Sequence, residues 1–362
     1  MGNPTSQDAD LIPDDLSGLP PWEAVPTDEA EAVKAIVQKI ETRVRAAAMS
    51  SPARRDAHPK AHGCVAAEFN VLDTLPPFLR VGIFSQVRSY QAWIRFSNGS
   101  EKPQKDALGD GRGMAIKLMG VERSRSGTQD FIMINSPAFF VRNAVDYVAF
   151  QEVANQLRFF FPSLNPFRFR IHELLMARAI TSRIVSNLLS IQYWSITPYL
   201  FGNIPCKFSA RPSGPKFTCK DRSTPNFLHD NLAKCLSTEG AAFDFCVQIR
   251  FTPDSMPIED PTIEWREADS PFIPVARISI PRQSFDAPEQ VAFCENLSFT
   301  PWHGLDDHRP LGGINRVRQA IYETISRVRH EINGVPRNEP VGISKLFTPI
   351  RSDGTPLGGT LE

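Results

Sequence analysis

Four short runs rich in β-branched and aromatic residues follow one another between residues 64 and 135, and they constrain the fold more than any other feature of the sequence. Glycine, proline and asparagine clusters separate the runs, as is typical of strands joined by turns. The runs read CVAAEFNV, YQAWIRFS, GMAIKLMGV and DFIMIN. Two later segments, FDFCVQIRF at 243–251 and PVARISIP at 274–281, are also expected to be strands, the first by its strict alternation. So many short strands indicate a closed or strongly curved antiparallel sheet.

Helical periodicity appears before, between and after the strands. Thr27 can cap a helix that Pro52 limits. Residues 137–200 are expected to be largely helical, with DYVAFQEVANQL and IHELLMARAITSRIVSNLLSIQYW as the main segments. A late helix over roughly 314–333 carries isoleucine and valine on one stripe. The order of strands, helices, strands and helix predicts an α+β protein.

Three parts are expected along the 362 residues. Residues 1–26 are rich in proline, aspartate and glycine and should form an extended N-terminal arm. Residues 27–335 should form the folded part, and a chain with 41% hydrophobic residues can bury a large core in one large domain or two smaller ones. Residues 336–362 should form an irregular C-terminal tail.

Charge and cysteine content exclude several classes of partner. Forty basic and forty acidic residues cancel, so we expect no nucleic-acid partner, and peripheral membrane contact has no support from the overall charge. Six scattered cysteines without a CxxC pair argue against a zinc knuckle or a dense disulfide framework and favour a reducing, cytoplasmic environment. The N-terminus lacks the apolar segment of a secretory signal.

The stretch RRDAHPKAHG places His58 and His62 four residues apart. Pro59 predicts an extended backbone for His58, which should then lie at a strand entrance and point into the space that the sheet encloses. Zinc sites with this histidine spacing need a helix and a third ligand, so we favour proton transfer by His58 over metal binding. His62 is interpreted as an ordinary core or surface histidine.

Arg318 and Tyr322 lie one turn apart in the late helix, and Arg329 shares their face. A guanidinium beside a phenol favours the phenolate, which is a hard ligand suited to ferric iron. On its own, this pair is better explained as an ordinary contact at a helix surface.

Several motifs together resemble the catalase superfamily of tyrosinate-ligated haem enzymes, and most closely its short, catalase-related peroxidase branch. They run in family order across roughly residues 55–330: RDAHPK, IRFSNGS, DGRGMAIKL, FIMINSPAFFVRN, FCVQIRF, PFIPVARISIP and LSFTPWHGLDDHRPLGGINRVRQAIY. The resemblance implies a catalase-like antiparallel β-barrel core with surrounding helices, in which residues 27–335 bind haem. It also implies that the C-terminal domain of the long catalases is lacking.

The resemblance also implies roles for single residues. Tyr322 would be the iron ligand and Arg318 its partner. His58 would be the catalytic histidine on the opposite side of the haem, oriented by the hydroxyl of Ser97. Asn135 would be the distal asparagine, although the family usually spaces that residue one position further from the proline.

Further matches concern the binding of the haem itself. Arg55 and Arg95 fall at positions that contact the haem propionates, and Arg329 is assigned to haem binding with them. Tyr147 falls where a phenylalanine normally stacks on the haem.

The implied function is a peroxidase or catalase-related enzyme with ferric haem b, which cleaves the O–O bond of hydrogen peroxide or of an organic or fatty acid hydroperoxide. A reducing co-substrate would complete the cycle, and the expected state is a monomer or homodimer. His58 would act as general base and then as general acid.

Three alternatives stay open at this point. The chain could rearrange fatty acid hydroperoxides, as the allene oxide synthase branch does, but that branch carries threonine where this chain has Ala57. It could instead be a haem-binding protein with little turnover, or a structural protein without haem. The phenylalanine- and arginine-rich residues 158–170 could line an entrance for an amphipathic carboxylate, although we favour a core segment with snorkelling arginines.

Overall fold

A computed structural model describes residues 22–49, 52–153 and 155–343. Its centre is a closed antiparallel barrel in which β5 pairs with both β4 and β7, so that eight strands form a ring and β6 extends from β7. The strands are β1 (Ala61–Val71), β2 (Ser89–Asn98), β3 (Arg112–Met119), β4 (Thr128–Ile134), β5 (Tyr193–Trp194), β6 (Tyr199–Phe201), β7 (Ile204–Pro212), β8 (Ala241–Ile249) and β9 (Ile273–Ile280). The expected α+β fold with an antiparallel β-barrel core is therefore confirmed.

Aromatic side chains fill the inside of the barrel. The ring of Phe245 lies 4.6 Å from that of Phe131 and 5.0 Å from that of Phe69, measured between ring centroids. Alternate residues of each strand point inward, as the alternation in FDFCVQIRF predicts, and Phe243 and Phe245 are both fully buried. Because the interior is packed with side chains, a site for a ligand has to lie outside the barrel.

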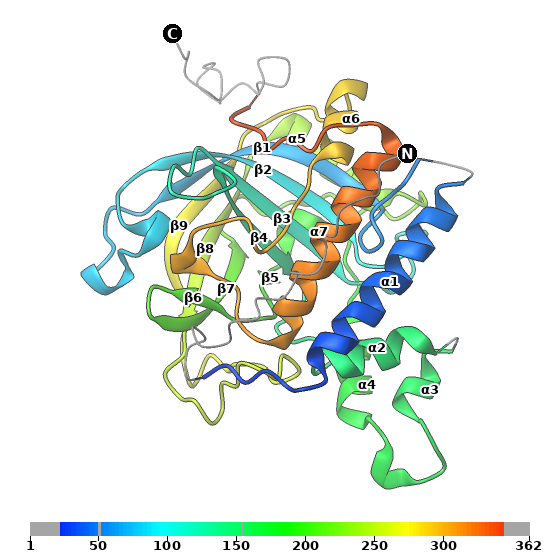
Figure 1. The fold of residues 1–362 in the computed structure, drawn as a ribbon. Helices are drawn as coiled ribbons and strands as arrows, with labels where there is room; N and C mark the ends of the chain where they lie inside the picture. Colours follow the sequence, from blue (N-terminus) through cyan, green and yellow to red (C-terminus); the bar gives the residue numbers. More distant parts are fainter. Residues whose placement is uncertain (1–21, 50–51, 154, 344–362) are drawn as a thin grey trace, which may run out of the picture.

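Helices cover the outside of the barrel. They are α1 (Glu29–Ala47), α2 (Ala144–Glu152), α3 (Leu157–Phe160), α4 (Ile171–Thr181), α5 (Phe227–Thr238), α6 (Pro288–Asn296) and α7 (Gly313–Asn333), with short 3₁₀ helices η2 (Pro77–Leu79), η3 (Gly82–Phe84), η4 (Pro166–Arg168), η5 (Leu188–Ser190) and η6 (Asp306–His308). Figure 1 shows α7 and α1 side by side, and their apolar stripes form a second buried cluster. No helix of the described residues is long and apolar enough to cross a membrane.

Most predicted elements are confirmed, but two helix predictions are wrong. The segment 171–194 is not one helix: α4 ends at Thr181, and η5 and β5 follow, because Tyr193 and Trp194 pair with β4 and β7. Helix α1 begins at Glu29, and Asp28, not Thr27, occupies its cap position. Strands β6 and β7 and helices α5 and α6 were not predicted.

The described part of the predicted N-terminal arm forms ion pairs with residues in and just before α7. From the predicted arm, the described residues begin at Trp22, and the buried carboxylate of Glu23 lies 2.6 Å from Arg309 and 3.0 Å from Arg316. Residues 1–21 of the arm and 344–362 of the tail lie outside the described residues.

A disulfide joins Cys64 of β1 to Cys294 of α6, a pairing that the scattered spacing of the cysteines did not reveal.

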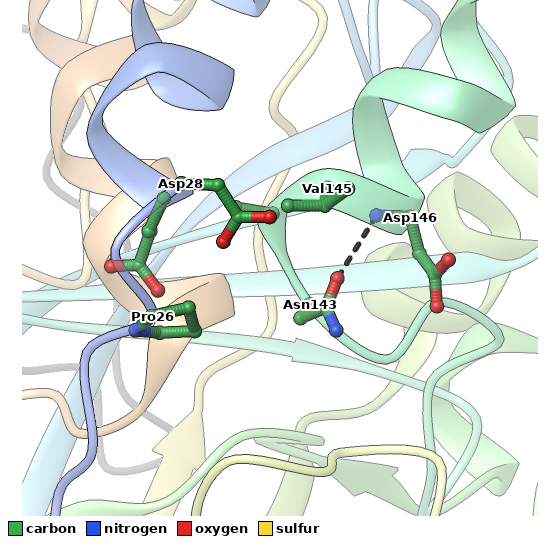
Figure 2. A pocket seen from close by; sticks show the side chains of 7 residues that line it. Pro26, Asp28, Asn143, Val145 and Asp146 are labelled. Carbon is green, nitrogen blue, oxygen red and sulfur yellow. Dashed lines mark hydrogen bonds between the residues drawn. The ribbon is translucent and has the colours of Figure 1, made fainter.

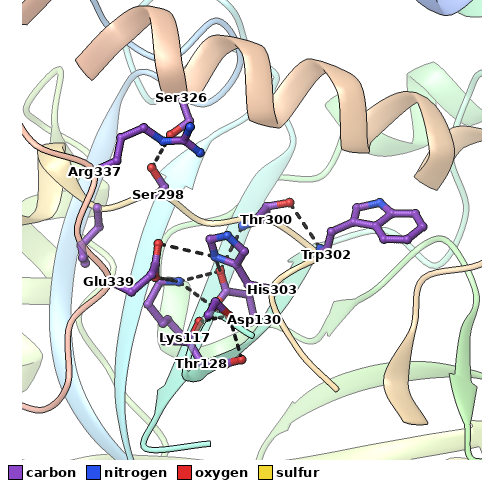
Figure 3. Close-up of polar contacts among 12 residues, drawn as sticks. Lys117, Thr128, Asp130, Ser298, Thr300, Trp302, His303, Ser326, Arg337 and Glu339 are labelled. Atoms are coloured by element: carbon purple, nitrogen blue, oxygen red, sulfur yellow. Dashed lines mark hydrogen bonds and ion pairs between the residues drawn. The ribbon is translucent and has the colours of Figure 1, made fainter. Parts of the chain in front are cut away.

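A buried ion cluster attaches the start of the predicted tail to the barrel (Figure 3). Lys117 Nζ lies 2.8 Å from both carboxylate oxygens of Asp130 and 2.6 Å from Glu339, while the amide of Thr300 donates to Asp130. Lys117 and Asp130 are fully buried. Burial raises the pKa of Asp130 to about 7, against the opposing charge of Lys117.

We expect Lys117→Met to lower the free energy of unfolding by about 3–5 kcal/mol, because the buried carboxylate of Asp130 and the partly buried carboxylate of Glu339 would lose their cation. Urea denaturation measures this change. Lys105→Met, at an exposed position, is the matched control and should stay within about 0.5 kcal/mol of the parent protein. A similar small effect at both positions would contradict the assigned role of the cluster.

Candidate functional site

His58 lies on the outer face of the barrel, just before β1. Its Nδ1 is 2.9 Å from Ser97 Oγ, and its backbone carbonyl accepts a hydrogen bond of 2.9 Å from Arg95 Nη2. The imidazole covers Gly113 of β3, where an added Cβ would come within 2.7 Å of the ring. Ser97, Arg95 and Gly113 alternate with inward-facing neighbours, so all three belong to the outer face. The prediction that His58 points into the space enclosed by the sheet is therefore wrong, because phenylalanine side chains fill that space.

The backbone of His58 also differs from the prediction. Its φ is +61°, in the left-handed region, whereas the following proline predicted an extended conformation. The contacts with Arg95 and Ser97 hold the residue in this unfavourable conformation. A strained backbone of this kind persists only where the surrounding contacts hold it in place, and such residues are found most often at functional sites.

The imidazole of His58 is neutral at physiological pH. Burial, together with the positive charges of Arg95, Arg318 and Arg55, lowers its pKa to about 3. Arg318 belongs to α7, so this influence also indicates that α7 passes near His58. A neutral imidazole can accept a proton, which is the first requirement of a general base.

Asn135 follows the end of β4, close to His58 along the sheet. Its side-chain oxygen accepts a hydrogen bond of 2.7 Å from the amide of Arg112, the residue before Gly113. Its Nδ2 is buried and has no hydrogen-bond partner among the described residues, so it is available as a donor. The preceding residue, Ile134, stands at the spacing where the family usually has its asparagine.

Three arginines gather around one carboxylate, that of Glu295 at the end of α6. Arg55 lies 3.1 Å and Arg95 3.7 Å from this carboxylate, and Arg329 of α7 donates to the backbone carbonyl of Glu295. Arg55 and Arg329 also donate to the carbonyl of Leu297, at 2.6 and 3.2 Å. The structure thus brings together the three arginines assigned to haem binding, although they are up to 274 positions apart in the sequence.

The electrostatics of this cluster favour further negative charge. Burial, together with the nearby charge of Arg55, lowers the pKa of Arg95 and of Arg329 to about 9. Burial opposes ionisation of Glu295, but the charges of Arg55, Arg95 and Arg329 outweigh it and hold the pKa of Glu295 below its ordinary value. Arg95 Nε is buried and has no hydrogen-bond partner among the described residues. The sequence analysis missed Glu295, which no motif singled out.

Arg318 and Tyr322 form the predicted pair on one face of α7. Arg318 Nη2 donates to Tyr322 Oη at 3.4 Å, and its guanidinium carbon lies 5.3 Å from the centre of the tyrosine ring. Nη1 of Arg318 donates to Asn315 at 3.1 Å and to Thr197 at 3.3 Å. These contacts fix the guanidinium of Arg318 beside the phenol of Tyr322.

Tyr147 lies on α2, where it packs against the cluster between α1 and α7. Gln151 donates to its hydroxyl at 3.4 Å. Burial raises the pKa of Tyr147, and the nearby Asp56 and Tyr322 contribute to that increase. The influence of Tyr322 indicates that the two tyrosines are neighbours, so Tyr147 lies on the α7 side of the site.

His62 belongs to a separate buried network behind His58. Its Nε2 is 2.7 Å from Asn98 Oδ1, and its Nδ1 is 3.9 Å from Asp106, which also binds Lys60 at 2.6 Å. The amide of Leu228 donates to Asp106 and links this network to the start of α5. His62 is therefore a core histidine, as the sequence indicated.

A cavity of about 180 Å³ lies where α1 and α2 begin (Figure 2), but its polar lining is mostly carboxylates and it contains none of the predicted site residues. In the described part of the chain, no three histidine, cysteine, aspartate or glutamate side chains are grouped so that they could hold a metal ion.

Four histidines with lowered pKa values predict a loss of stability in acid. Burial lowers the pKa to about 3 for His58 and to about 4 for His62, His303 and His308. The unfolded chain binds protons below pH 6.5 that the folded chain does not yet bind, so the full stability is present above pH 6.5 and falls as the pH falls toward 4. Each imidazole contributes up to about 1.4 kcal/mol per pH unit. The raised pKa of Asp130 has the opposite effect on stability, because the folded protein binds this proton at a higher pH than the unfolded chain does.

Urea denaturation across this pH range checks the prediction. His308 Nε2 accepts a hydrogen bond from the amide of Ile83, so His308→Gln keeps an acceptor there and should make the dependence on pH less steep. Stability that stays constant or rises as the pH falls would show that the imidazoles are already protonated in the folded protein.

Comparisons with known proteins come from sequence and from structure. Residues 38–156 match the family model for catalase. A bacterial catalase has a TM-score of 0.64 and 16% identity, with 90% of this chain and 66% of the other covered. A fungal catalase gives 0.64 and 17%, with 80% and 63% covered, and catalase A from Saccharomyces cerevisiae gives 0.60 and 19%, with 83% and 72% covered. No curated protein matches by sequence. The chain therefore spans about two thirds of the length of the first two catalases.

Proposed function

Because residues 38–156 match the family model for catalase and the fold is similar to that of solved catalases, we propose that the chain belongs to the catalase superfamily and is a haem-dependent enzyme that cleaves the O–O bond of a peroxide. The observation that most supports this proposal is the gathering of three groups on one side of the barrel. These groups are His58, the Arg318–Tyr322 pair and the arginine cluster around Glu295. They come from β2, α6 and α7 and from the segment before β1, and the hydrogen bond from Arg95 to His58 and the electrostatic influence of Arg318 on His58 link them.

The residues present suit ferric haem b. Tyr322, with Arg318 beside it, offers an anionic oxygen ligand for ferric iron. Arg55, Arg95 and Arg329 face the single carboxylate of Glu295, so two positive charges exceed the negative charge within this group, which matches two propionates. The unpartnered Nε of Arg95 offers a further donor. Haem would supply the redox chemistry of O–O cleavage.

The protein residues would transfer the protons and orient the peroxide. For Nε2 of His58 to accept a proton from the peroxide, Nδ1 must carry the ring proton and donate it to Ser97 Oγ, 2.9 Å away. His58 then returns the proton to the departing oxygen. Asn135 Nδ2, which has no partner among the described residues, would donate a hydrogen bond that orients the peroxide.

The complete reaction needs a source of two electrons. Reduction of hydrogen peroxide consumes two electrons and two protons and releases two water molecules, whereas an organic hydroperoxide yields one alcohol and one water. A second hydrogen peroxide, oxidised to dioxygen, or an organic donor would supply the electrons. The first course is a catalase reaction and the second a peroxidase reaction.

The test is to add haemin to the purified protein, record its absorption spectrum, and compare hydrogen peroxide with a long-chain fatty acid hydroperoxide as substrates. Oxygen release, or oxidation of a phenolic donor, would support the proposal. Conversion of the hydroperoxide without consumption of the donor would indicate an isomerase or lyase. A haem spectrum without turnover would indicate a haem-binding protein, and a colourless protein would overturn the proposal.

A further inference from the structure

The hairpin formed by α3, η4 and α4, residues 157–181, exposes large apolar side chains to solvent. Leu164 is 100% exposed and Phe167 is 97% exposed. Further exposed apolar residues of the hairpin are Leu157, Phe161, Ile171 and Leu175. The interpretation of residues 158–170 as a core segment is therefore wrong for most of its length, since only Phe159 and Phe160 of this stretch are buried.

The exposed charged side chains of the hairpin are all positive. Arg158, Arg168 and Arg178 are exposed and form no ion pair with any described residue. The only acidic residue of the hairpin, Glu173, is buried and bound to Arg142. The surface of the hairpin is thus apolar and cationic, although the whole chain has no net charge.

Internal contacts hold the hairpin in shape. Asn165 Oδ1 accepts a hydrogen bond of 3.0 Å from the amide of Phe167, and the rings of Phe161 and Phe169 meet at 5.0 Å. At its base, Arg170 donates to the carbonyl of Phe159 at 2.9 Å and to Asp146 at 3.0 Å. Because these contacts already exist in the free protein, little further ordering is needed on binding.

The shape of the hairpin discriminates between possible partners. Figure 1 shows α3, α4 and the loop between them projecting away from the barrel. A projecting tip offers little area for a protein interface, and pairing two copies through it would bring their arginines together. A lipid bilayer accepts a projecting apolar tip, and anionic headgroups complement the arginines.

We propose that this hairpin docks on bilayers that contain anionic phospholipid. Leu164 and Phe167 enter the boundary between headgroups and acyl chains, while Arg158, Arg168 and Arg178 contact lipid phosphates. The proposal depends on the surface alone and does not rest on the proposed function, so the two can fail separately.

Vesicle flotation tests the proposal with the full chain and without any enzyme assay. We expect binding to vesicles of phosphatidylglycerol and phosphatidylcholine in equal parts and much weaker binding to pure phosphatidylcholine. Leu164→Ser with Phe167→Ser should lower the partition coefficient about 100-fold, since two large apolar side chains no longer enter the bilayer. Arg158→Glu with Arg168→Glu should lower it about tenfold or more on the anionic vesicles only.

Matched controls separate the site from general effects. Phe78→Ser removes a side chain that is 63% exposed elsewhere, and Arg125→Glu with Arg282→Glu changes the net charge by the same amount as the hairpin pair. Both controls should bind like the parent protein, and circular dichroism should show every variant folded. Absence of binding, or equal loss in the controls, would overturn the proposal. Sedimentation without lipid gives a second test of the double variant Leu164→Ser with Phe167→Ser. If this variant were a monomer and the parent protein a dimer, the proposal would also be overturned, because the surface would then join two copies of the chain.

Discussion

Replacing His58 by asparagine is expected to lower peroxide turnover by about 10²- to 10⁴-fold while the haem spectrum persists. Asparagine tolerates the left-handed backbone conformation that His58 adopts, so the substitution should not disturb the segment. It retains a polar side chain near Ser97 but cannot accept a proton as imidazole does. Initial rates with hydrogen peroxide, normalised to bound haem, measure the effect.

His62→Gln is the matched control for this result. His62 is fully buried in the network with Asn98 and Asp106, so its replacement should reduce stability and leave turnover per bound haem unchanged. If His58→Asn turned over at the parental rate, His58 would not be the proton-transfer group. The protein would then fit a haem carrier better than an enzyme.

Replacing Tyr322 by phenylalanine is expected to have the second large effect, on haem binding itself. Removing a residue that only hydrogen-bonds to a metal ligand lowers metal affinity about 10- to 100-fold. Removing the oxygen ligand itself should therefore lower the affinity for haem by more. Titration with haemin, followed by absorption, measures the dissociation constant and shows whether the band pattern changes. Arg318→Gln, which keeps the phenol but removes its cation, should give a smaller loss.

Tyr90→Phe is the matched control, because it removes a phenol from β2 whose hydroxyl donates only to the carbonyl of Ile83. It should leave the haemin titration unchanged. An unaltered spectrum in Tyr322→Phe would show that another side chain is the ligand. In that case the Arg318–Tyr322 pair would be the ordinary helix-surface contact that the sequence also allowed.

Elements with strong periodicity could be predicted from the sequence, and elements that depend on partners could not. Helix α7 carries an apolar stripe over 21 residues, so its position was predicted closely. Strand β5 has only two residues and exists because β4 and β7 hold it. The helix prediction for 171–194 failed at this point, since a local pattern does not reveal tertiary pairing.

The candidate site was predicted in part for a similar reason. Residues one helical turn apart, such as Arg318 and Tyr322, must lie together wherever the helix forms, so their pairing follows from spacing. Glu295 lies far along the chain from Arg55 and Arg95 and stands in no distinctive motif. Its place between the arginines follows from the packing of α6 against β1, where the disulfide between Cys64 and Cys294 joins the two elements.

The sequence by itself determined the short antiparallel strands, the late helix with its arginine–tyrosine pair, and the order of motifs that resembles catalases. Only the tertiary structure decided that the site lies outside the barrel, because alternation separates the two faces of a strand without telling which face the closed ring encloses. The tertiary structure also decided the backbone conformation of His58. Contacts with Arg95 and Ser97 outweigh the preference for an extended backbone that Pro59 imposes. It also decided that Leu164 and Phe167 are exposed, since burial depends on what packs against a residue and not on the residue alone.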